Sequence, residues 1–104
     1  MIRCRFEKKA GALTGFSLAG HAGYAEEGSD IVCAAVSAAC DLTIHLAESY
    51  FGCAPAVCEG DGRISFQARE SAGDADRLLR GFLDYLREVE RGYGAFIQIQ
   101  ITEV

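Results

Sequence analysis

The residues most able to do chemistry lie close together between positions 20 and 40. His21 is one of two histidines in the chain, and Cys33 follows it after a loop that contains Gly23 and Gly28. An imidazole can take the proton of a thiol, and the resulting thiolate is a strong nucleophile. The pattern therefore predicts a cysteine–histidine pair for acyl transfer, a reaction that requires neither a metal ion nor a cofactor.

Cys33 falls at about the third position of an expected helix that opens at Ser29-Asp30. The free amides of a helix N-terminus carry about half a positive charge, which favours a thiolate over a thiol. The same amides, near residues 31 to 33, are candidates to stabilise the oxyanion of a tetrahedral intermediate. If the preceding strand ends beside the start of this helix, His21 can reach the sulfur.

Several neighbours of the pair have more than one possible role. Asp30 can cap the helix, orient His21, or bind a basic side chain of a substrate. Ser37 lies one turn after Cys33 on the same helix face, where it either bonds back to a carbonyl or lines the site. The acidic pair at 26–27 is either a solvated loop charge or a means of attracting a basic peptide.

The remaining cysteines are expected to be mostly small buried apolar residues. The chain has an odd number of cysteines and no Cys-x-x-Cys pair, which argues against a disulfide framework and against a structural zinc site. Cys4 lies in the middle of an expected strand and should be buried. Cys40 lies two turns after Cys33, about 10 Å along the helix, which is too far for a redox-sensing disulfide between them. His45 lies deep in the same helix and is expected at its surface or packed.

Hydrophobic periodicity predicts an α+β fold with two layers and the element order ββαββαβ. The expected strands cover residues 1–7, 13–20, 54–59, 63–68 and 95–104, and the expected helices cover 30–51 and 72–91. An apolar stripe recurs at Ile31, Ala35, Ala38, Leu42 and Leu46 in the first helix, and at Leu78, Phe82, Leu86 and Val89 in the second. The strands should form a mixed or antiparallel sheet of about five strands, with both helices packed on one face.

The bulk properties describe a single domain over residues 1–104 with a net charge of −5. An acidic chain lacks the basic face that a duplex nucleic-acid binder needs, whereas a basic protein or peptide would suit it. Residues 1–8 contain no apolar core of a secretory signal, and no apolar run approaches the ~20 residues of a membrane span. We therefore expect a cytosolic protein without a membrane partner.

The stretch GHAGYAEEGSDIVCAAVSAA, which begins at Gly20, resembles the signature of the ribosomal-processing cysteine proteases, the Prp family. That signature combines Gly-His-Ala, a glycine-rich loop, and Asp-Ile-Val-Cys-Ala-Ala-Val-Ser. The match is dense over residues 20 to 38, and the length and element order are similar along essentially the whole chain.

The resemblance implies a function and a set of site residues. Members of the family are bacterial cytoplasmic endopeptidases that form homodimers and remove a short N-terminal extension from ribosomal large-subunit protein twenty-seven. By this resemblance Cys33 is the nucleophile and His21 the general base, while Gly20, Asp30 and Ser37 match positions associated with substrate binding or with support of the pair. The loop from Ala22 to Ser29 matches a mobile segment over the site.

An alternative interpretation is a non-catalytic module for ribosome assembly or for binding an adaptor. In that case Cys33 would be a buried helix residue, and an exposed edge strand would bind the partner. The accessibility and reactivity of the Cys33 sulfur distinguish the two interpretations.

Overall fold

The computed structural model describes residues 1–69 and 74–104. Seven elements follow one another: β1 (Ile2–Lys9), β2 (Ala12–Ala19), α1 (Ile31–Ser49), β3 (Ala56–Gly60), β4 (Arg63–Gln67), α2 (Asp74–Tyr93) and β5 (Ile97–Glu103). The order ββαββαβ is thus confirmed. The predicted start of the second helix at residue 72 lies outside the described residues.

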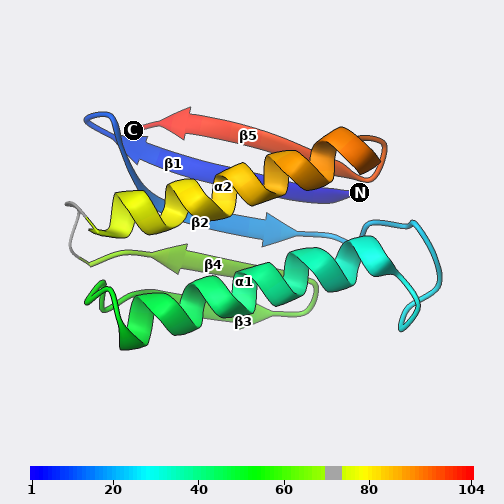
Figure 1. Ribbon diagram of the computed structural model, residues 1–104, viewed down its shortest axis with the longest axis horizontal. Coiled ribbons are helices and arrows are strands. Elements are labelled where there is room, and N and C mark those ends of the chain that lie inside the picture. The colour runs from blue at the N-terminus through cyan, green and yellow to red at the C-terminus, as the bar shows by residue number, and fades with distance from the viewer. Residues whose placement is uncertain (70–73) are drawn as a thin grey trace.

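The five strands form one mixed sheet with the spatial order β3-β4-β2-β1-β5. Strand β1 pairs parallel with β5, whereas β1–β2, β2–β4 and β3–β4 are antiparallel. Both helices cover the same face of this sheet (Figure 1). The predicted two-layer α+β architecture is therefore confirmed, and β3 and β5 are the edge strands.

Four phenylalanines join the sheet to α2 in the core. Phe16 stacks on Phe66 at a centroid distance of 5.0 Å, and Phe82 of α2 meets Phe16 at 4.9 Å and Phe6 at 5.8 Å. The whole predicted stripe of α2 is buried. Truncation of such a side chain, as in Phe82→Ala, typically costs about 3–5 kcal/mol of stability.

Helix α1 packs on the sheet through a different stripe from the predicted one. Its buried residues are Val32, Val36, Cys40, Thr43 and Ala47. Ile31 and Leu42 of the predicted stripe are instead 53% and 57% exposed. The many alanines make this helix apolar on nearly every side, so periodicity alone could not select the packed face. The observed rotation places Cys33 and Ser37 beside the packed face, next to the β3–β4 hairpin.

The sequence analysis expected no apolar run close to the length of a membrane span, and α1 departs from this expectation. Among the described residues, α1 is 19 residues long with a mean hydropathy of 1.5, which by length and composition suffices to cross a membrane. In this fold one side of the helix is packed against the sheet. The predicted catalytic Cys33 is the third residue of this helix.

Candidate active site

Asp30 caps α1 and also holds the loop that precedes the helix. One carboxylate oxygen, Oδ1, accepts hydrogen bonds from the amides of Val32 and Cys33, both at 3.0 Å. The other, Oδ2, accepts from the amides of Tyr24 at 3.0 Å and Ala25 at 3.3 Å. The hydrogen bond from the Cys33 amide contributes most to lowering the pKa of Asp30, and the other three bonds lower it further. Burial acts in the opposite direction and raises this pKa. The predicted capping role is confirmed, and the charged carboxylate ties the loop to the helix start.

This cap changes the expectation about the oxyanion. The amides of Val32 and Cys33 both donate to Asp30. In this conformation both amides are engaged by the Asp30 carboxylate, and their role as oxyanion donors stays a prediction.

The Cys33 sulfur is half-buried and receives a hydrogen bond from the loop. Cys33 is the third residue of α1, as predicted, and the Ala22 amide donates to its Sγ at 3.2 Å. A donor aimed at sulfur stabilises the thiolate, which is the nucleophilic form. Sequence reasoning missed this contact because a backbone amide has no residue signature.

His21 is positioned by the end of β2 and by the β3–β4 turn. Gly20 follows the last residue of β2 with a φ of +91°, and a Cβ there would lie 2.5 Å from the carbonyl oxygen of Met1, so only glycine fits. The Gly20 amide donates to the carbonyl of Gly62 at 2.9 Å. A Cβ at Gly62 would lie 3.5 Å from the His21 Nε2, so the imidazole rests against this turn.

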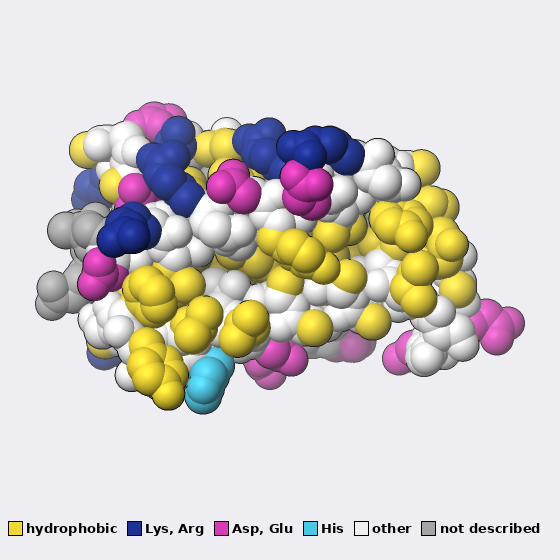
Figure 2. Space-filling view, in the orientation of Figure 1, with side chains coloured by type: hydrophobic (Ala, Val, Ile, Leu, Met, Phe, Trp, Pro, Cys, Tyr) yellow, Lys and Arg dark blue, Asp and Glu magenta, His cyan; other side chains and the backbone are white. Residues whose placement is uncertain are grey.

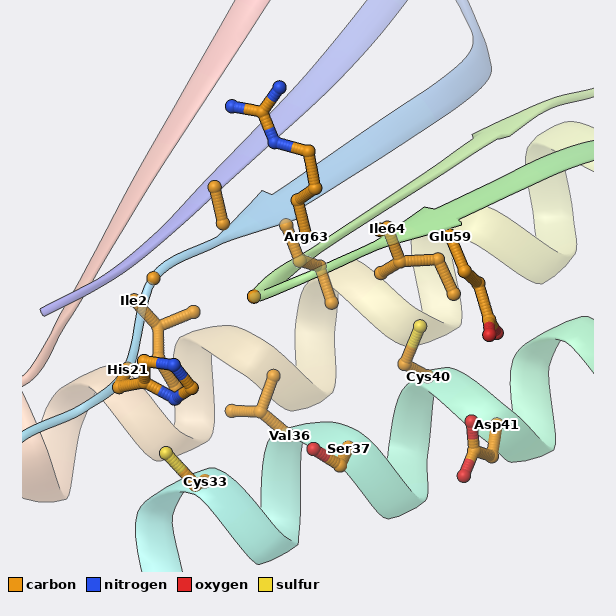
Figure 3. A pocket seen from close by; sticks show the side chains of 15 residues that line it. Ile2, His21, Cys33, Val36, Ser37, Cys40, Asp41, Glu59, Arg63 and Ile64 are labelled. Atoms are coloured by element: carbon orange, nitrogen blue, oxygen red, sulfur yellow. The ribbon is translucent and has the colours of Figure 1, made fainter. Parts of the chain in front are cut away.

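Two cavities meet at the predicted catalytic pair. One, of about 270 Å³, runs between α1 and the β3–β4 hairpin, and the other, of about 420 Å³, runs along the loop over residues 21–30. His21, Cys33 and Ser37 line both. In Figure 3 the Cys33 sulfur is directed away from α1 toward the side on which the His21 imidazole lies. The structure thus places the two predicted reactive side chains in the lining that the two cavities share.

The loop over residues 21–29 has a second anchor besides Asp30. The ring of Tyr24 makes edge-on contacts with Tyr93 at the end of α2, at 5.5 Å, and with Phe96, at 5.2 Å. Sequence reasoning did not find this anchor, because the two aromatic partners lie some 70 residues farther along the chain. The loop is therefore attached to α1 on one side and to the end of α2 on the other.

The other cysteines differ sharply from Cys33. Burial raises the pKa of Cys4 and Cys40 to about 12 and also raises that of Cys53, which confirms the expected buried cysteines. Cys58 is the exception among these four and is exposed on β3. Among the residues that the structure describes, no three His, Cys, Asp or Glu side chains lie together as metal ligands would.

Comparison with known proteins identifies related chains. The family model described as cysteine protease Prp matches residues 1–98. Among solved structures, an essential ribosomal processing protease Prp from Staphylococcus aureus, in complex with a covalently linked product peptide, is 24% identical with a TM-score of 0.94, and the match covers 98% of this chain and 100% of that one. A protein of Streptococcus mutans is 27% identical with a TM-score of 0.82, over 100% of this chain and 96% of that one. No curated protein sequence matches significantly.

Proposed function

Because the chain belongs to the Prp family of cysteine proteases, we propose that it is an endopeptidase with Cys33 as nucleophile and His21 as general base. The observation that carries the proposal is the junction of two cavities at which both side chains lie. A cysteine in the first helical turn, with an amide donor on its sulfur, suits a thiolate nucleophile.

The reaction proceeds by acyl transfer. His21 takes the thiol proton, the Cys33 sulfur bonds to the substrate carbonyl carbon, and the carbonyl electron pair moves to oxygen. When the intermediate collapses, the C–N bond breaks and the imidazolium gives its proton to the leaving amine. Water, deprotonated by His21, then hydrolyses the thioester and releases Cys33. In the resting site the Ala22 amide donates to the Cys33 sulfur at 3.2 Å. Once the sulfur has bonded to carbon, its charge lies on the neighbouring carbonyl oxygen, and we assign the Ala22 amide to that oxyanion as its donor.

Three further residues support the pair in this proposal. Gly20 provides the tight turn that delivers His21, and Asp30 fixes the loop on the helix start. The Ser37 side chain is exposed one turn beyond Cys33 and lines both cavities, where its hydroxyl can bind the substrate backbone. Gly20 and Asp30 thus affect substrate binding indirectly, because they position His21 and the loop that precedes α1.

The proposed substrate is the N-terminal extension of ribosomal large-subunit protein twenty-seven, cleaved in the cytoplasm. The related Staphylococcus aureus enzyme is a ribosomal processing protease. A ribosomal protein rich in basic residues would be attracted to a chain of net charge −5. Neither a direct nucleic-acid partner nor a membrane partner is part of the proposal. We further propose that residues 1–104 act as a single domain, which the pairing of β1 with β5 in one sheet supports.

We also propose a homodimer that buries the outer face of the helix layer. A cavity of about 490 Å³ lies between α1 and α2, and beside it Leu42 and Tyr85 are 57% and 42% exposed. Figure 2 shows hydrophobic side chains gathered over both helices on this face. A second copy related by a two-fold axis would place like apolar patches together. Leu42→Glu should give a monomer in light scattering, while Gln98→Glu on the opposite sheet face should remain dimeric.

The alternative of a non-catalytic adaptor predicted that Cys33 is buried in the helix packing. Cys33 is instead half-buried and lines the groove, which favours the protease. The decisive experiment incubates wild type and Cys33→Ala with the extended ribosomal protein and follows trimming by mass spectrometry. The proposal expects trimming by wild type alone. Trimming by both proteins, or by neither while circular dichroism shows intact folds, would refute it.

A further inference from the structure

The groove between α1 and the β3–β4 hairpin has an acidic end remote from the catalytic pair. Asp41 of α1 and Glu59 of β3 line this groove together with Cys33 and His21. Figure 3 shows their two carboxylates at the opposite end of the groove from the His21 imidazole. Asp41 is eight residues after Cys33 on one helix, so about 12 Å of helix axis separates the two.

An apolar wall joins the reactive end to the acidic end. Leu18, Val36 and Cys40 are buried, and Ile64 is half-buried, while all four line the groove. Such a wall accepts the methylene stem of a long side chain but offers its charged head no partner. Among the described residues that line this groove, the carboxylates that could neutralise a cation lie beyond this wall.

Within residues 1–69 and 74–104, no ion pair is found to either carboxylate. The ion pairs found among the described residues join Asp76 to Arg80 and Glu88 to Arg91, both in α2. Arg63 also lines the groove, but Figure 3 shows its guanidinium directed away from both carboxylates. Burial is the largest cause of the raised pKa of Cys40, and the negative charges of Asp41 and Glu59 are the next largest. Because Cys40 is part of the apolar wall, the electric field of the two carboxylates acts on this wall.

We propose that Asp41 and Glu59 form a specificity subsite for a basic side chain of the substrate. The inference rests on the proposed peptidase function, because it assumes that the peptide lies along this groove. An extended peptide advances about 3.3 Å per residue, so 12 Å corresponds to three or four residues from the scissile carbonyl. A lysine or arginine at that distance would lay its stem on the apolar wall and place its charge between the carboxylates.

The test uses internally quenched peptides that carry Lys, Gln or Glu at each position up to five residues on either side of the scissile bond. Wild type should cleave the peptides with Lys three or four residues away about threefold to thirtyfold better in kcat/KM than those with Gln, mainly through KM, and less so at high salt. Asp41→Lys/Glu59→Lys should reverse this order in favour of Glu. Asp41→Asn/Glu59→Gln should abolish the preference without creating the opposite one.

A matched control separates the local subsite from net charge. Glu48→Lys/Glu103→Lys makes the same charge change at exposed positions outside the groove and should keep the preference for Lys. An unchanged preference in Asp41→Lys/Glu59→Lys, or an equal loss in the control, would overturn the subsite while leaving the peptidase proposal intact. If no peptide is cleaved in a Cys33-dependent manner, the proposed function itself fails, and the subsite with it.

Discussion

Cys33 and Cys40 lie on the same helix and line the same groove, yet their surroundings are opposite. The sulfur of Cys33 is half-buried at the helix start and accepts a hydrogen bond from the Ala22 amide. Cys40 is 3% exposed, and burial, followed by the carboxylates of Asp41 and Glu59, raises its pKa to about 12.

The difference teaches that burial, as well as position along a helix, decides what a thiol can do. At the first turn the Ala22 amide donates to the Cys33 sulfur, and Cys33 lines both cavities, whereas Cys40 is enclosed in the core. A thiol with a pKa of about 12 keeps its proton at neutral pH and remains an inert part of the core. Two turns of helix therefore separate a candidate nucleophile from a structural residue.

The largest expected effect separates the two cysteines by activity. Cys33→Ala should lower kcat/KM by about 10³-fold or more, because no nucleophile remains at the groove junction. Cys40→Ala leaves the pair in place and should cost far less, about tenfold at most, through a changed groove wall. Peptide cleavage rates measure both. Equal losses of activity in the two variants would contradict the assignment of Cys33 as nucleophile and Cys40 as a structural residue. Cys58 lies outside this groove, so Cys58→Ala serves as the neutral control.

His21 should account for the next largest effect. His21→Ala should lower kcat by about 10²- to 10⁴-fold, because the thiol proton then has no acceptor and the leaving amine no donor. The second histidine, His45, is exposed on α1 and does not line the groove, so His45→Ala is the matched control. Steady-state kinetics would contradict the assignment if both histidine variants behaved alike.

Asp30 tests whether the environment of Cys33 depends on the cap. Asp30→Asn weakens the hydrogen bonds to the loop and to the helix start, and the displaced pair should lose about tenfold to a hundredfold in kcat/KM. It should also lower the midpoint of thermal unfolding.

The control for this variant is another carboxylate that accepts from a backbone amide, at a place remote from the groove. Asp76 accepts from the Leu13 amide at 2.7 Å and pairs with Arg80. Asp76→Asn should likewise lower the unfolding midpoint but retain activity in the folded protein. Activity losses of equal size in the two variants would mean that Asp30 acts only through general stability.

The smallest effect concerns stability at alkaline pH. Burial raises the pKa of Cys4 and Cys40 from about 9.0 to about 12. Between these values the unfolded thiols lose their protons while the folded ones keep them, so the free energy of unfolding must fall as pH rises. Urea titrations from pH 8 to 11 should show this decline, with a shallower slope for Cys40→Ala. An unchanged slope in Cys40→Ala would contradict the conclusion that Cys40 is a buried, protonated thiol.

Local chemistry made the start of α1 predictable from the sequence. Ser29-Asp30 before an apolar run identified the cap, and the cap fixed Cys33 at the third helical position, as observed. Alternation of apolar and polar residues identified the strands, because one face of the sheet is covered by helices and the other is not. Each of these features depends on residues within a few positions of one another.

The features that the sequence did not reveal depend on contacts between distant segments. Gly62 reaches His21 because β2 pairs with β4, and Tyr24 reaches Tyr93 because α2 ends beside the loop. The rotation of α1 was mispredicted because Ile31 and Leu42 are as apolar as the residues that pack. Glu59 lines the groove because β3 pairs with β4, and the sequence alone did not reveal this position.

The most direct test of the central claim, that Cys33 is activated by His21, is to map the site of covalent labelling by a peptidyl chloromethyl ketone. Such a reagent enters as a substrate does and alkylates the nucleophile in the groove. Peptide mapping by mass spectrometry should find the adduct on Cys33, with slow labelling at most on exposed Cys58 and a strongly reduced rate on Cys33 in His21→Ala. Preferential labelling of another cysteine, or an equal rate at Cys33 in wild type and His21→Ala, would contradict the account.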